Sequence, residues 1–414
     1  MAMAVQAQTL ALDECKRLAK ENNYELKNKM LEQQAATQTR REAFTNYFPT
    51  VDAMGAYMNA NKGLLELPSI NPQTGMPITV SMIKNGKTAS LTAMQPVFAG
   101  GQIVNGNRLA KIGQEVSRLQ YRQSEDRVEK TTEQYFWQIV QLEEKLKTIA
   151  AMEEQVKQIR KDVELAIKAG VSTRNDLLRV ELQEYELASN RLKLENGVSV
   201  TKLLLRQYIG VESKDFTLQY AAFTDPESPL SYYVDAQQAV LTRPEAAMLN
   251  CNVKATKLQK QMEVGKRLPS VGVGASYFYH DFMDTDYNAA VVFASVSVPV
   301  SEWWGGSHAI KKQALKQRQA ENERRNNLEL MAVEIEQTWN ELQEAYKQIL
   351  LARSSIASAE ENMRMNRDFF KAGTVTLTDV LDAQTLLQQS DDKLTEACTG
   401  YQLKLTEYRL MTGR

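Results

Sequence analysis

Cysteine and histidine, the side chains that most often bind metals or act as nucleophiles, are few and far apart in this sequence. The cysteines are Cys15, Cys251 and Cys398, and the histidines are His280 and His308. This spacing gives neither a disulfide framework nor a C-x-x-C pair, and no nucleophile stands near a base in a catalytic pattern. The sequence therefore predicts a protein that is not an enzyme and that binds no metal and no cofactor.

One short acidic segment, residues 284–288, resembles the start of a calcium-binding loop. Asp284, Asp286 and Asn288 have the spacing of the first three ligands of such a loop. Ala289 and Ser295 stand where the loop needs a glycine and a bidentate acid. We therefore interpret this run as the acidic tip of a hairpin.

Composition excludes two further classes of protein. The 414 residues carry 50 Lys and Arg against 51 Asp and Glu, so no basic field favours nucleic acid. Mean hydropathy is -0.43, and no run approaches the roughly 20 apolar residues of a membrane helix. Residues 1–8 lack the basic and apolar regions of a signal peptide. The chain is accordingly either cytoplasmic or a form from which an export signal has been removed.

The sequence repeats itself. Residues 24–57 align without a gap to residues 244–277, an offset of 220, with Pro49 opposite Pro269. Later landmarks repeat at offsets of 205 and 203. We interpret the chain as a tandem duplication with a first repeat at 9–210, a linker at 211–231 and a second repeat at 232–414.

Each repeat has the same predicted elements. A short helix (about 10–21 in the first repeat) and a helix over about 24–47 precede two strands. The strands are expected at about 50–60 and 88–97 in the first repeat, and at about 271–280 and 290–300 in the second, where apolar residues alternate. Apolar residues then recur every seven positions, which predicts long helices with a left-handed packing seam over about 102–169 and 307–371. Gly170 and Gly373 end these helices, and a return helix follows each.

Four strands are too few to close a membrane barrel alone, because known barrels have at least eight strands. Lipid also offers no hydrogen-bond partners to the backbone groups of an unpaired edge strand. If the strands cross a membrane, the chain must therefore form an oligomer.

The order of these elements, together with residues 372–382 (AGTVTLTDVLD) and the Asn23–Leu26 and Arg243–Ala246 sites, resembles the TolC family of outer-membrane efflux channels. The resemblance covers about residue 9 to the C-terminus. It implies a mainly α fold with a small β part, in which a homotrimer joins twelve strands into a transmembrane β-barrel and its long coiled-coil helices into a periplasmic tunnel.

The resemblance also implies a function and its partners. The trimer would be the exit channel of a tripartite efflux or type I secretion system in the outer membrane of a Gram-negative bacterium. It would contact outer-membrane lipid, a periplasmic adaptor (membrane fusion) protein and an inner-membrane pump, and would bind no nucleic acid. Drugs, small molecules or proteins would pass through it.

The same resemblance assigns site residues. Asp379 and Asp382 match the acidic rings that line the family's tunnel entrance, although acids at a helix start also simply complement the helix dipole. Gly170, Gly373 and Asp176 mark the periplasmic tip turns where adaptors dock, with capping favoured for Asp176. In a separate group, Trp303 and Trp304 fit membrane-interface anchors, with helix packing as the alternative.

The tip also departs from the family pattern. Phe370 and Val375 stand where relatives often carry a tyrosine and an arginine that latch the closed tip. Arg174 and Lys371 are the substitutes that the sequence offers.

A cytoplasmic coiled-coil scaffold is the alternative function, because it also explains the seven-residue repeats. Such a scaffold has no use for four strands at matched positions.

Overall fold

The computed structural model describes residues 8–212, 216–221, 223, 226–282 and 286–413. The chain divides into two compact units: unit 1 comprises residues 1–32, 118–248 and 325–414, and unit 2 comprises residues 33–117 and 249–324. Each unit therefore contains segments from both sequence repeats. Four helices contribute residues to both units: α2 (Tyr24–Thr45), α3 (Gln102–Lys168), α6 (Pro244–Gly265) and α7 (Glu302–Lys371).

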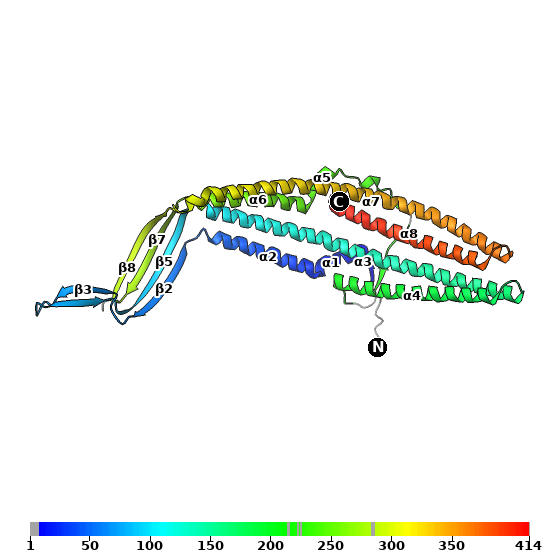
Figure 1. Cartoon of the computed structure of the whole chain (residues 1–414), viewed down its shortest axis with the longest axis horizontal. Coiled ribbons are helices and arrows are strands. Elements are labelled where there is room, and N and C mark those ends of the chain that lie inside the picture. The colour runs from blue at the N-terminus through cyan, green and yellow to red at the C-terminus, as the bar shows by residue number, and fades with distance from the viewer. Residues whose placement is uncertain (1–7, 213–215, 222, 224–225, 283–285, 414) are drawn as a thin grey trace. The chain divides into compact units, whose positions relative to one another are not determined.

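Unit 2 contains the predicted strands. β2 (Thr50–Asn59), β5 (Asn85–Ala99), β7 (Ser270–His280) and β8 (Tyr287–Ser297) form one antiparallel sheet in the order β2-β5-β7-β8 (Figure 1). The register pairs Ala99 with Ser270 and Ser270 with Ser297. The strand ends that connect to helices therefore all lie at one end of the sheet. Both sequence-predicted hairpins are confirmed.

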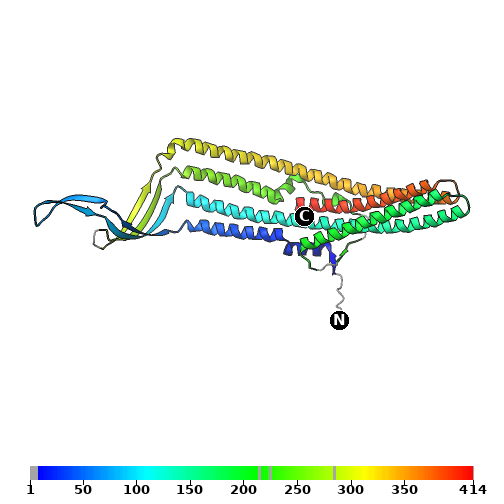
Figure 2. The same cartoon turned by 60° about the horizontal axis from the view of Figure 1, so that its bottom comes forward.

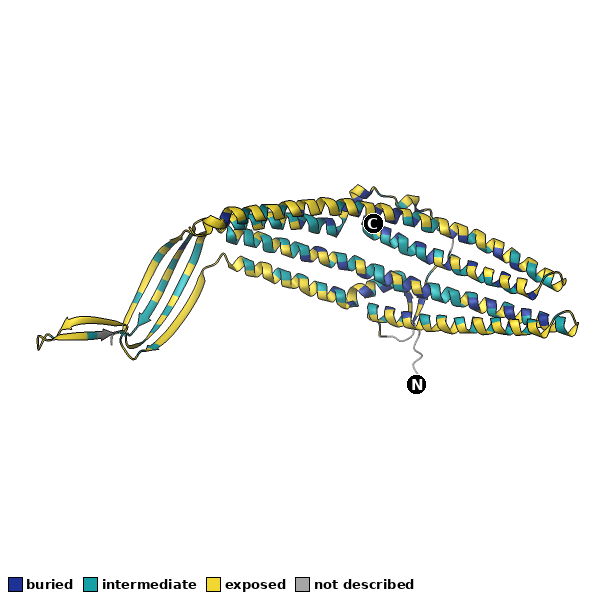
Figure 3. Cartoon of the chain, in the orientation of Figure 1, coloured by how far each residue is buried: buried dark blue, intermediate teal, exposed yellow. Residues whose placement is uncertain are grey.

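The two faces of this sheet differ in chemistry. Residues that are paired directly across an antiparallel ladder share a face, and the face changes at each step along a strand. Through the register, the middle of one face carries apolar or aromatic residues and glycine: Val51, Ala53, Gly55 and Tyr57; Ala89, Leu91 and Ala93; Val273, Ala275, Tyr277 and Tyr279; and Ala290, Val292 and Ala294. Polar side chains join this face only toward its ends, at Lys87, Gln95 and Asn288. The other face is richer in hydroxyl side chains, and there Thr92 and Ser276 are hydrogen-bonded at 2.9 Å. It also carries larger apolar side chains, namely Met54, Met58, Met94, Phe278 and Phe293. Figure 3 colours most of the sheet as exposed or intermediate.

Unit 1 holds the helical core. α4 (Arg174–Ile209) returns beside α3, and α8 (Leu377–Thr412) returns beside α7. The predicted seven-residue seams are buried, with Val128, Val156 and Val163 fully covered on α3, and Ile335, Leu342 and Ile349 almost fully covered on α7. The coiled helix packing predicted from the sequence is confirmed. Among the described residues, no helix has a stretch that is both long and apolar enough to cross a membrane.

The internal repeat is visible in the element bounds. α2 and α6 each have 22 residues and begin 220 positions apart, and β2 and β7 also begin 220 positions apart. α4 and α8 each have 36 residues and begin 203 positions apart. The boundaries of the repeats and their linker remain a prediction.

The predicted start of the second long helix is wrong. α7 begins at Glu302 rather than 307, because Gly305 and Gly306 keep negative φ and continue the helix, whereas Gly100 and Gly101 have positive φ before α3. Just before α6, Thr242 is the last residue of the short helix α5 (Ala236–Thr242). Its hydroxyl donates to the Ala239 carbonyl at 2.8 Å.

Four further strands were not predicted. β3 (Leu65–Ile70) and β4 (Pro77–Met82) form a hairpin inside the loop between β2 and β5. β1 (Gln8–Ala11) pairs in parallel with β6 (Phe216–Gln219). The segment expected to be only a linker thus supplies a strand, and its Phe216 and Leu218 are buried with Leu10 beside the short helix α1 (Leu12–Asn22).

Candidate functional site

Two tight turns join the long helices to their return helices in unit 1. Gly170 follows α3 with φ of 75°, and Gly373 follows α7 with φ of 73°. In the first turn, the Val171 N–H donates to the Ala166 carbonyl and the Gly170 N–H to the Ile167 carbonyl, each at 3.0 Å. Thr374 and Gly373 repeat these bonds to Phe369 and Phe370. Both turns are Schellman motifs, which satisfy carbonyls that a helix end leaves free.

Each return helix begins with a capping box. Thr173 precedes α4 and Thr376 precedes α8, and each threonine hydroxyl accepts from the N–H of the aspartate three residues later at 3.4 Å. The Asp176 carboxylate accepts in return from the Thr173 N–H at 2.9 Å, and the Asp379 carboxylate from the Thr376 N–H at 2.8 Å. The aspartates were predicted from the sequence, whereas the threonines were not, although the T-x-x-D pattern indicates them.

These bonds hold the two carboxylates ionised. The side chain and backbone N–H of Thr376 lower the pKa of Asp379, and the backbone N–H and hydroxyl of Thr173 lower that of Asp176. Because both pKa values lie below those of an unfolded chain, the stabilisation is present above about pH 4 and is lost as pH falls through the native-state value.

Asp382 differs from Asp379 in its role. It lies three residues further along α8, on the exposed side of the helix, while Val380 and Ala383 face the core. No described residue forms a hydrogen bond or ion pair with the Asp382 carboxylate. The structure therefore gives Asp379 a capping role and leaves the Asp382 carboxylate open to solvent on the same helix face.

The two turn-bearing helix pairs pack together within unit 1. Their shared core contains Met152, Val156, Ile159 and Val163 from α3, Val180 and Leu187 from α4, Ala359 and Met363 from α7, and Leu377, Val380, Ala383 and Leu387 from α8. Polar contacts also join the pairs: the Arg179 guanidinium donates to the Thr378 hydroxyl, and the buried Gln384 amide donates to the Met152 carbonyl at 3.3 Å. In Figure 2 the two turns lie side by side.

The residues at the latch positions contribute apolar contacts instead of the family's polar pair. Phe370 packs against the shared core, and Val375 is half-buried in the turn before α8. Arg174 is the exposed first residue of α4, and Lys371 is the exposed last residue of α7. The Arg179–Thr378 bond and the Arg367–Asp162 ion pair, at 3.6 Å, are polar links between the two helix pairs that the sequence did not indicate.

The tryptophans lie in unit 2, in the first turn of α7. Trp303 is 50% exposed and Trp304 is 83% exposed, and the Trp303 indole N–H donates to the Arg267 carbonyl at 2.9 Å. Arg267 lies between α6 and β7, so this bond ties the start of α7 to the start of a strand. Because the Trp304 ring is so exposed, helix packing within the chain does not explain its position.

Side chains that could bind a metal are not clustered in the described part of the chain. Within the described ranges, no three His, Cys, Asp or Glu side chains are grouped so as to hold a metal ion. Asp284 of the calcium-like run lies outside the described residues.

Comparisons with known proteins agree with this architecture. The sequence matches the family described as outer membrane efflux protein over residues 16–211 and 236–414. Outer membrane efflux protein BepC of Brucella suis biovar 1 (strain 1330) is 25% identical over 283 residues, which are 67% of this chain and 60% of BepC. The match thus spans less than two thirds of that relative.

Solved structures show the same fold. The Campylobacter jejuni CmeC outer membrane channel is 15% identical and superposes with a TM-score of 0.79, covering 100% of this chain and 90% of CmeC. The Vibrio cholerae outer membrane protein VceC is 12% identical with a TM-score of 0.78, covering 97% of this chain and 96% of VceC. The chain belongs to the outer membrane efflux protein family.

Proposed function

We propose that three copies of the chain form the outer-membrane exit channel of a tripartite efflux or type I secretion system. In this assembly the strands cross the outer membrane and the helices form a tunnel in the periplasm. Drugs, small molecules or proteins pass through it from a periplasmic adaptor and an inner-membrane pump.

The main support for this proposal is the difference in side-chain chemistry between the two faces of the sheet. Its strands have 10 to 15 residues, enough for the roughly 9 to 11 that cross a bilayer when tilted. The continuous apolar face suits lipid, and the hydroxyl-rich face suits a water-filled lumen. A non-membrane coiled-coil scaffold gives no reason for an exposed apolar face that runs through all four strands.

The sheet edges explain why the chain needs copies of itself. Within the described residues, β2 and β8 are the edge strands and each has one neighbour in the sheet. They run in opposite directions, so β8 of one copy beside β2 of the next continues the antiparallel order. Repeated around a threefold axis, this head-to-tail contact closes a twelve-stranded barrel and leaves no edge in lipid.

The helix turns are proposed as the periplasmic end of the tunnel. They lie at the ends of α3 and α7 opposite to the ends that connect to the sheet. Gly170, Gly373 and Asp176 shape the turns that an adaptor would contact. Asp382, with Asp379 beside it, would line the entrance, where threefold symmetry brings six carboxylates together and attracts cations. Trp303 and Trp304 would anchor the barrel at the lipid interface.

Removal of the entrance charges tests this function. In planar bilayers, we expect the double variant Asp379→Asn and Asp382→Asn to have a lower preference for cations and a weaker block by divalent ions, because six negative charges leave a narrow mouth. Asp382→Asn alone should produce part of this change without disturbing the capping box.

Asp176→Asn is the matched control, since Asp176 caps α4 with the geometry that Asp379 has on α8. It should leave ion selectivity unchanged. An unaltered reversal potential and block in the double variant would reduce Asp379 and Asp382 to residues that only stabilise the start of α8.

A further inference from the structure

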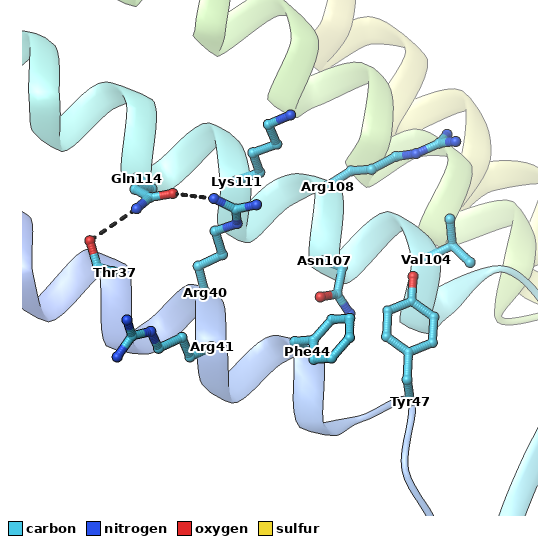
Figure 4. A pocket seen from close by; sticks show the side chains of 10 residues that line it. All are labelled: Thr37, Arg40, Arg41, Phe44, Tyr47, Val104, Asn107, Arg108, Lys111 and Gln114. Carbon is cyan, nitrogen blue, oxygen red and sulfur yellow. Dashed lines mark hydrogen bonds between the residues drawn. The ribbon is translucent and has the colours of Figure 1, made fainter.

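A groove in unit 2 is lined by cations and by aromatic rings. It has a volume of about 710 Å³ and lies between α2 and α3, a size typical of ligand pockets. Its lining residues are Thr37, Arg40, Arg41, Phe44 and Tyr47 from the first helix segment, and Val104, Asn107, Arg108, Lys111 and Gln114 from the second (Figure 4). None of the described residues that line it is acidic.

The cations of the groove are not neutralised by neighbours. No described carboxylate forms an ion pair with Arg40, Arg41, Arg108 or Lys111, and these four side chains are exposed. Arg40 donates to the Gln114 amide oxygen at 2.8 Å, which leaves most of its guanidinium donors available. Four uncompensated positive charges around one concave surface favour an anion, and guanidinium groups suit phosphate oxygens in particular.

The frame of the groove is fixed by side-chain bonds between its two helices. Gln114 also donates to the Thr37 hydroxyl at 2.9 Å, and Asn107 donates to the Ala43 carbonyl at 2.7 Å. These contacts lie at both ends of the cationic part. The cations are therefore presented on a preformed surface rather than on a helix that is free to turn.

The lining changes character along the groove. Tyr47 lies three residues before β2, and Val104 lies five residues after β5, so the aromatic and apolar residues lie at the end next to the sheet, where the Arg108 side chain also extends in Figure 4. Arg40 and Lys111 lie further from the strands, as Figure 4 shows. The Phe44 ring lies at a tilt to the Tyr47 ring and edge-on to the Phe48 ring, with centroid distances of 5.5 and 5.6 Å. An amphiphile with its tail toward the membrane and its anionic head in water has the same order of chemistry.

The second repeat lacks this combination. At the offset of 220, Lys260 replaces Arg40, but Val264 replaces Phe44 and Arg267 replaces Tyr47. The Arg267 guanidinium is paired with Glu263 at 3.0 Å. The repeat therefore keeps positive charge without the aromatic end, which provides an internal control.

We propose that this groove binds the phosphate of an anionic lipid headgroup at the helix side of the membrane sheet, with the acyl chains against Phe44 and Tyr47. The shared chemistry is a phosphate group, which a lipid or free phosphate could supply, and the apolar end of the groove selects the lipid. This proposal uses the membrane location of the sheet but not the identity of the exported substrate.

Binding of soluble short-chain lipids to the detergent-purified full chain tests the proposal. Dihexanoyl phosphatidylglycerol, dihexanoyl phosphatidylcholine and inorganic phosphate are titrated separately, and each Kd is measured by calorimetry. We expect phosphatidylglycerol to bind at least about tenfold more tightly than the other two probes. Equal affinity for inorganic phosphate would overturn the lipid assignment, and equal affinity for phosphatidylcholine would overturn the anionic one.

Substitutions in the groove and in α6 test whether the lipid binds at the proposed site. Arg40→Gln with Lys111→Gln should weaken phosphatidylglycerol binding about tenfold or more, because charge-assisted hydrogen bonds are lost. Phe44→Ser should weaken the lipid and leave phosphate affinity unchanged. Lys257→Gln with Lys260→Gln removes the same charge from α6 and should have no effect.

An unchanged lipid Kd in the Arg40 and Lys111 variant, or an equal loss in the α6 control, would overturn the proposal. Helicity by circular dichroism confirms that each variant is folded. The mass of the same samples reports the trimer separately, so failure of lipid binding is distinct from failure of the channel assembly.

Discussion

Replacing Val292 with arginine should abolish assembly in the outer membrane. Val292 is 84% exposed at the middle of β8, on the apolar face of the sheet, where it pairs with Ala275. An arginine at the bilayer midplane of a β-barrel costs about 2 to 4 kcal/mol, and a trimer would incur that cost three times. We expect the amount of trimer in the outer-membrane fraction, measured on native gels, to fall to background.

The neighbouring residue gives the matched control. Val291 pairs with Ser276 on the opposite face, so Val291→Arg makes the same chemical change toward the proposed lumen. It should preserve the trimer and alter only conduction. Equal losses from both substitutions would contradict the assignment of the two faces.

Replacing Gly170 and Gly373 with valine should impair export while the trimer persists. Apart from the adjoining residues of the chain, no described heavy atom lies within 4 Å of a Cβ built at either glycine, so the added side chain meets no other part of the described structure there. Its effect comes from the backbone, because a β-branched residue at positive φ costs on the order of 1 to 3 kcal/mol at each turn. The turns should then adopt another conformation and present an altered surface to the adaptor.

Asparagine separates conformation from side-chain bulk in these turns. It adopts positive φ more readily than valine, so Gly170→Asn with Gly373→Asn should retain export. Drug resistance is measured in the native host from which the chromosomal copy has been deleted. Normal resistance in the valine variant would show that the turns do not engage the partner that export requires.

Much of the helical fold could be predicted because its signals are local and repeated. Val128, Val156 and Val163 recur at multiples of seven residues, and Gly170 ends the pattern. Burial then follows from the seam, since each such residue must face another helix. The gap-free alignment at offset 220 likewise predicted equal lengths for α2 and α6.

The missed strands had no local signal. β1 and β6 have four residues each and pair across 208 positions, so neither shows an alternating pattern of useful length. β3 and β4 contain Pro68 and Pro77, which usually argue against a strand. A two-stranded hairpin tolerates them, because each strand keeps one unpaired side.

The site was predicted only in part, for a related reason. The glycine and the aspartate of each turn lie within about six residues of one another, so Gly373 and Asp379 could be predicted from one short stretch of sequence. The groove could not be predicted from the sequence, because Arg40 and Lys111 are 71 positions apart. Each residue alone is also typical of a solvated helix face. Only the packing of α2 on α3 brings them together.

The mass of the protein purified in detergent tests the central claim most directly. In a trimeric channel, β2 and β8 of each chain must pair with strands of neighbouring chains before the sheet can lie in lipid. Native mass spectrometry should therefore show a complex of three 46.8 kDa chains. A stable, folded species with the mass of a single chain would contradict the proposal that this protein forms a trimeric outer-membrane channel.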